Sequence, residues 1–150
     1  MSGSKKSASF SIKKAQYYVW YLGWKECRGL GGREFTEPIV KELVHRRSGE
    51  ELPKLTIEVS KKELKIVQLV ENRKGKIDKV KYPPVLSKDV TYAVQALSPD
   101  EDVVACIFLG YNPHTKCAVH VHVYRCDSVE TARLLVNHLN QLAHLPEHME

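Results

Sequence analysis

The chain has 150 residues, of which 43% are hydrophobic and 27% are charged, enough for one globular domain with its own core. It contains no apolar run of about 18 residues, which argues against a membrane-spanning helix, and residues 1–12 lack the apolar segment of a secretory signal. The net charge of +5 allows a phosphopeptide, an acidic membrane surface or nucleic acid as partner, without choosing among them. We expect residues 1–12 to form a flexible arm and residues 146–150 a short tail.

The first predicted elements are a strand and a helix. Residues 15–24, AQYYVWYLGW, are aromatic and β-branched, which is typical of a strand. A glycine-rich loop leads to a predicted helix with Thr36 as its N-cap, in which Ile39 and Leu43 recur at helical spacing. Gly49, which follows two arginines, is expected just past the end of this helix.

The middle of the chain predicts strands in series, without helices between them. Apolar and polar residues alternate in residues 54–60 and in most of residues 63–71, and the prolines after Tyr82 predict a loop over residues 83–89. Segments rich in turn formers separate the later strands. Further strands are predicted at residues 77–82, 90–97, 103–111 and 117–126.

A long helix closes the chain. Asp127 or Ser128 can cap it, and its apolar residues recur on one face. The order of elements predicts an α+β fold: a seven-stranded antiparallel bent β-sandwich or open barrel, capped by the C-terminal helix, with one helix between the first two strands. The apolar face of the closing helix consists of Ala132, Leu135, Val136, Leu139, Leu142 and Ala143.

Residues 117–126, CAVHVHVYRC, raise the question of a metal or catalytic site. His120 and His122 share one face of the predicted strand. Cys117 faces the other side, and Cys126 lies about 13 Å along the strand from His122, so zinc would lack further ligands here. The chain has no recognisable catalytic or nucleotide-binding motif. We therefore predict no metal, no cofactor and no catalytic residues. All four cysteines lie far apart, and reduced thiols in a cytosolic protein are expected.

Basic residues are concentrated between Lys61 and Lys81. Only Tyr82 supplies an aromatic ring there, so a nucleic-acid platform is not expected. A solvated face or a site for an anionic lipid headgroup explains the charge equally well. The candidate lipid-binding residues are Lys61, Lys62, Arg73, Lys74, Lys76 and Lys79.

Four stretches together resemble the phosphotyrosine-binding (PTB) domain family, which has the pleckstrin-homology (PH) superfold. The sequence Tyr21-Leu22-Gly23 is similar to the family's first strand, and VTYAVQAL from Val90 to one of its later strands. VVACIFLG and VHVYRC are similar to the two strands before the closing helix. The resemblance extends over residues 13–145 and implies an adaptor or scaffold domain rather than an enzyme.

The resemblance also implies a site. Family members add a peptide, often containing Asn-Pro-x-Tyr, to a sheet edge beside the terminal helix. This predicts a cytoplasmic, membrane-proximal domain that binds a tyrosine-containing peptide, with a phosphoinositide or acidic membrane surface as the alternative partner. Whether phosphotyrosine is required stays open, and a phosphate-independent mode is slightly favoured. The expected peptide-binding residues are Val90, Thr91, Tyr92, Ala93, Val94, Leu139, Leu142 and Ala143, and the expected phosphate-binding residues are Lys116, His120, His122 and Arg125.

Overall fold

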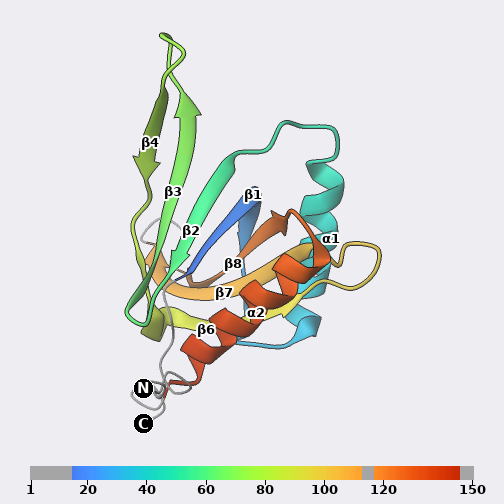
Figure 1. Cartoon of the computed structure of the whole chain (residues 1–150). Coiled ribbons are helices and arrows are strands. Elements are labelled where there is room, and N and C mark those ends of the chain that lie inside the picture. Colours follow the sequence, from blue (N-terminus) through green and yellow to red (C-terminus); the bar gives the residue numbers. More distant parts are fainter. Residues whose placement is uncertain (1–14, 113–116, 146–150) are drawn as a thin grey trace, which may run out of the picture.

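The computed structural model describes residues 15–112 and 117–145 (Figure 1). Its strands form one antiparallel sheet in the order β4-β3-β2-β1-β8-β7-β6, and the short β5 pairs with β3 beside this path. The predicted α+β architecture is confirmed. The elements are β1 (Ala15–Glu26), α1 (Arg33–Arg46), β2 (Lys54–Val59), β3 (Glu63–Glu71), β4 (Ile77–Lys81), β5 (Val85–Leu86), the 3-10 helix η3 (Ser87–Asp89), β6 (Val90–Gln95), β7 (Val103–Asn112), β8 (Cys117–Cys126) and α2 (Val129–Ala143).

Two parts of the predicted pattern need correction. The loop predicted after Tyr82 contains β5, a two-residue strand that pairs only with the start of β3, so the described residues have eight strands rather than seven. Helix α1 begins at Arg33, and Thr36 is a buried residue of its second turn instead of its N-cap. Pro38 lies inside this helix, and its ring removes only one main-chain donor near the helix start.

Strand β7 lies between two apolar layers, which explains its continuous apolar sequence. Val104 and Cys106 face the core beneath α2, whereas Val103, Ala105 and Ile107 face the core beneath α1. A strand that is covered on both faces has no polar side, so its residues do not alternate. Figure 1 shows α2 crossing the sheet over β6, β7 and β8.

Strand β1 bends at the Tyr-Leu-Gly sequence. Its register with β8 shifts between Tyr21 and Gly23, which leaves Leu22 as an extra residue. Gly23 has a φ of 127°, and a Cβ there would lie 3.4 Å from the side chain of Leu43 in α1. The bend therefore needs glycine for its backbone conformation, whereas the space beside Leu43 would admit a Cβ in van der Waals contact.

Helix α2 has the predicted cap and the predicted buried face. The Ser128 hydroxyl accepts a hydrogen bond from the Thr131 N–H at 3.0 Å, which satisfies one of the free donors at the helix start. Four residues of the predicted apolar stripe are buried against the sheet. They are Ala132, Leu135, Leu139 and Leu142.

Candidate functional site

Strand β6 forms one end of the sheet and lies beside α2. It pairs on one side with β7, with a register shift between Val90 and Tyr92, and no strand of the described chain pairs with its other side. The Ala93 side chain is buried, so β6 is anchored to the core while its outer main chain stays at the sheet edge. Such an edge can accept another extended chain through main-chain hydrogen bonds.

The side chain of Asn140 in α2 forms hydrogen bonds with the outer main-chain groups of β6. The Ala93 N–H donates to Asn140 Oδ1 at 3.1 Å, and Asn140 Nδ2 donates to the Ala93 carbonyl oxygen at 2.9 Å. One side-chain amide thus makes the pair of hydrogen bonds that a neighbouring strand would make with this residue.

Side chains of α1 occupy the same edge further along. Arg33 Nη1 donates to the Gln95 carbonyl oxygen at 2.9 Å, and the Leu97 N–H donates to Glu37 Oε1 at 3.4 Å. Arg33 and Glu37 also form an ion pair at 3.6 Å. The edge is therefore covered at residues 93, 95 and 97, which alternate as the outward positions of a strand do.

The helix wall beside β6 differs from the expected one. Leu139 and Leu142 are buried in the core beneath α2, so their side chains are not open to a ligand. Ala143 is half-buried. Because Asn140 faces β6, the helix positions on the same side one turn away are Val136 and Ala143. The sequence signal for this wall is an asparagine beside the apolar stripe of α2.

The other expected peptide-binding residues lie on β6 as predicted from the sequence. Val90 is buried, and Tyr92 and Val94 are half-buried against the core beneath α1. The Thr91 hydroxyl donates to the Leu30 carbonyl oxygen at 2.9 Å, which ties the loop before α1 to this strand. Val90 and Ala93 pack in the core beneath α2, so the part of β6 that is left for a ligand is its outer main chain.

His120 and His122 lie among aromatic rings instead of at an open phosphate site. The Tyr21 hydroxyl lies 2.9 Å from His122 Nδ1, and the ring centroids of Phe108 and His122 are 5.1 Å apart. The Trp24 ring packs against both imidazoles. Burial, followed by the neighbouring His120, lowers the pKa of His122 to about 4, so this imidazole is neutral near pH 7. That placement does not suit the expected phosphate contact at His122.

Of the other members of the expected phosphate set, Arg125 is ion-paired, His120 has a buried ring nitrogen, and Lys116 is not among the described residues. Arg125 Nη2 lies 3.2 Å from Asp100 Oδ1, and Arg125 Nε lies 3.4 Å from Asp102 Oδ2, so two carboxylates balance its charge. The Nε2 atom of His120 is buried without a hydrogen-bond partner. Lys116 lies outside the described residues.

The expected lipid-binding residues fall into two groups. Lys61 and Lys62 lie in the turn between β2 and β3. Arg73, Lys74 and Lys76 lie in the turn between β3 and β4, and Lys79 lies on β4 opposite Leu69. Figure 1 shows the β3–β4 hairpin projecting from the rest of the sheet. Strand β3 has nine residues, so the two turns are roughly 27 Å apart at about 3.4 Å per residue. The group at the tip consists of Arg73, Lys74, Lys76 and Lys79 and is called the hairpin tip below.

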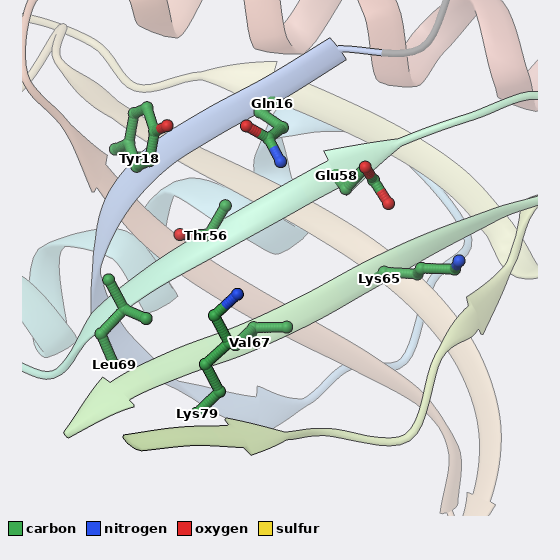
Figure 2. A pocket seen from close by; sticks show the side chains of 8 residues that line it. All are labelled: Gln16, Tyr18, Thr56, Glu58, Lys65, Val67, Leu69 and Lys79. Atoms are coloured by element: carbon green, nitrogen blue, oxygen red, sulfur yellow. The ribbon is translucent and has the colours of Figure 1, made fainter. Parts of the chain in front are cut away.

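A hollow lies on the outer face of β1 to β4, away from β6 and α2 (Figure 2). It has a volume of about 450 Å³, and its most exposed apolar side chains are Tyr18 (64%) and Leu69 (41%). Glu58 lines it together with two lysines, so its charge is mixed. Its lining residues are Gln16, Tyr18, Thr56, Glu58, Lys65, Val67, Leu69 and Lys79.

Within residues 15–112 and 117–145, no three His, Cys, Asp or Glu side chains are grouped closely enough to hold a metal ion. No helix in the same residues is both long and apolar enough to cross a membrane.

Comparison of the structure with solved structures identifies its fold. The solution structure of the C-terminal phosphotyrosine interaction domain of mouse APBB2 is similar to it with a TM-score of 0.66, over 97% of this chain and 96% of that one, at 16% sequence identity. The chain has a PTB-like fold of the PH superfold. A crystal structure of the Slm1 PH domain in complex with inositol-4-phosphate matches with a TM-score of 0.49 at 13% identity, over 89% of this chain and 96% of that one. No protein-family model matches the sequence, and no curated protein has significant similarity to it.

Proposed function

We propose that this PTB-like domain is a non-enzymatic adaptor that binds a tyrosine-containing, Asn-Pro-x-Tyr-like peptide as an added strand on β6. The observation that carries the proposal is the β6 edge, which has main-chain groups at Ala93 and Gln95 directed away from β7. Helix α2 lies beside this edge and supplies the second wall of a peptide groove through Val136 and Ala143. Main-chain pairing would provide affinity, and contacts with α2 would provide selectivity.

We infer that this mode does not require phosphate. The neutral His122 and the charge-balanced Arg125 offer no spare positive charge to a phosphotyrosine. A doubly charged phosphate needs such a charge, best supplied by an arginine that can make two hydrogen bonds to it. A phosphorylated and an unphosphorylated peptide of the same sequence should therefore bind with similar affinity.

An NMR titration of the isotope-labelled domain tests the proposal. An Asn-Pro-Ala-Tyr peptide should shift the amide signals of β6 and of the facing side of α2. Because the residues of a strand alternate in direction, one N-methyl group on a peptide residue that faces β6 should abolish binding. Moving that N-methyl group by one residue should preserve binding and is the matched control. Equal binding of the two N-methylated peptides, or peptide-induced shifts confined to other elements, would contradict strand addition.

A second candidate function is binding to an acidic membrane surface through the hairpin tip. All five residues of β4 are exposed, and Ile77, with 62% of its surface exposed, lies beside the basic residues of the tip. Basic side chains next to exposed aliphatic ones suit an anionic, partly apolar surface.

Sedimentation with phosphatidylserine vesicles tests this second function. Reversing the charge of Lys74 and Lys76 should weaken binding severalfold, and raising the salt concentration should do the same. The matched control reverses Lys61 and Lys62 at the other end of β3, which should change vesicle binding little. An equal loss in both double variants would argue for a diffuse charge effect instead of a site at the hairpin tip.

A further inference from the structure

We infer that Asn140 is a latch on the docking edge, which an incoming peptide must displace before it can pair with β6. The inference rests on the proposed function and adds the residue that sets the affinity and selectivity of the groove. It starts from the position of Asn140, whose side chain lies where the main chain of a bound peptide would lie.

The side-chain amide of Asn140 reproduces the chemistry of a peptide group. It has one carbonyl acceptor and an NH₂ donor, and it uses both on the main chain of Ala93, at 3.1 Å and 2.9 Å. An added strand would need the same N–H and the same carbonyl oxygen. Asn140 and the ligand therefore compete for the same two groups.

Displacement of the latch leaves no buried polar group without a partner. The Ala93 groups would exchange Asn140 for the peptide, and Asn140 is only half-buried, so its freed amide can turn towards water or towards the ligand. The exchange makes as many hydrogen bonds as it breaks. Only molecules with an open edge can bind the peptide. The apparent binding constant is therefore the intrinsic one multiplied by the fraction of molecules in which the latch is open.

The latch also bears on selectivity. A peptide gains from opening it only if its own residue opposite Ala93 can pair through both its N–H and its carbonyl oxygen. Proline lacks the N–H and therefore cannot replace Asn140 Nδ2 as the donor to the Ala93 carbonyl oxygen. Arg33 and Glu37, which cover Gln95 and Leu97, extend the same protection along the edge. Natural sheets protect their edges against non-specific pairing in this way.

The alternative role of Asn140 is purely structural, as a staple that holds α2 on the sheet. The two roles predict different changes in peptide affinity when Asn140 is removed. Loss of a staple would loosen α2 and weaken or preserve peptide binding, whereas loss of a latch would strengthen it.

The test measures two quantities in wild-type protein and in Asn140→Ala. The first is the amide hydrogen exchange of Ala93 without peptide, which should accelerate in the variant because its acceptor is gone. The second is the affinity for the unphosphorylated Asn-Pro-Ala-Tyr peptide, which should increase about tenfold, within the range of two net hydrogen bonds. Asn140→Asp keeps the size of the side chain but loses the donor to the Ala93 carbonyl, and it should also bind more tightly. Asn137→Ala, at an exposed position of the same helix, is the control and should match wild type.

The outcomes separate the latch from the proposed function. Equal affinity of wild type and Asn140→Ala, with peptide-induced shifts still on β6, would overturn the latch and leave strand addition standing. Weaker binding by Asn140→Ala would overturn it as well, because Asn140 would then help to hold the ligand or the helix. If no variant binds the peptide while Ala93 exchange still accelerates, the proposed function and the latch both fall.

Discussion

Acidification should destabilise the domain through His122. The pKa of this histidine is lowered to about 4 in the folded protein, mainly by burial, whereas an unfolded histidine titrates near about 6.5. Between these values the unfolded chain binds a proton that the folded chain does not. The contribution of the neutral imidazole is therefore fully present above about pH 6.5 and is lost as the pH falls towards 4.

The size of the effect follows from the two pKa values. The free energy of unfolding should be lower by roughly 2 kcal/mol at about pH 5 than at about pH 7.5. Each pH unit between the two pKa values changes it by about 1.4 kcal/mol. The perturbation that isolates this contribution is His122→Gln, which removes the titrating group and keeps a polar side chain near the Tyr21 hydroxyl.

Urea unfolding followed by circular dichroism across this pH range provides the assay. The wild-type free energy of unfolding should fall more steeply with acid than that of His122→Gln, by about 2 kcal/mol between about pH 7.5 and 5. His45→Gln, at an exposed position of α1, should retain the wild-type dependence on pH. If His122→Gln and wild type lose stability in parallel, the reasoning that His122 is held neutral by burial is refuted.

Three other substitutions test features of the fold through the same urea assay. Gly23→Ala should destabilise the domain by about 1–3 kcal/mol, because its φ of 127° strains any residue with a Cβ; no loss would show that the bend in β1 can relax. Ser128→Ala should cost about 1 kcal/mol through the lost acceptor for the Thr131 N–H, and an unchanged midpoint would mean that water replaces the cap. Leu135→Ala should cost about 2–5 kcal/mol because the side chain is fully buried, whereas Leu134→Ala, at an exposed neighbouring position, should change stability little.

Patterns between close neighbours in the sequence determined the element order and the fold class. The apolar stripe of α2, its cap at Ser128 and the alternation in β2 each depend on residues within one or two turns of each other. Such patterns persist because local geometry fixes which side chains share a face. The same patterns carried the resemblance to the PTB family, and the observed fold agrees with it.

Only the tertiary structure decided which residues pack against the faces of these strands and helices. Alternation placed His120 and His122 on one side of a strand, but the packing of β1 and β7 around them surrounded both imidazoles with aromatic rings. Likewise, strand β3 separates basic residues that are close in sequence. Asn140 and Ala93 are 47 positions apart, and no local pattern could pair them. Their contact forms because the closing helix buries its leucines against the sheet, and that burial brings the asparagine beside them to the edge of β6.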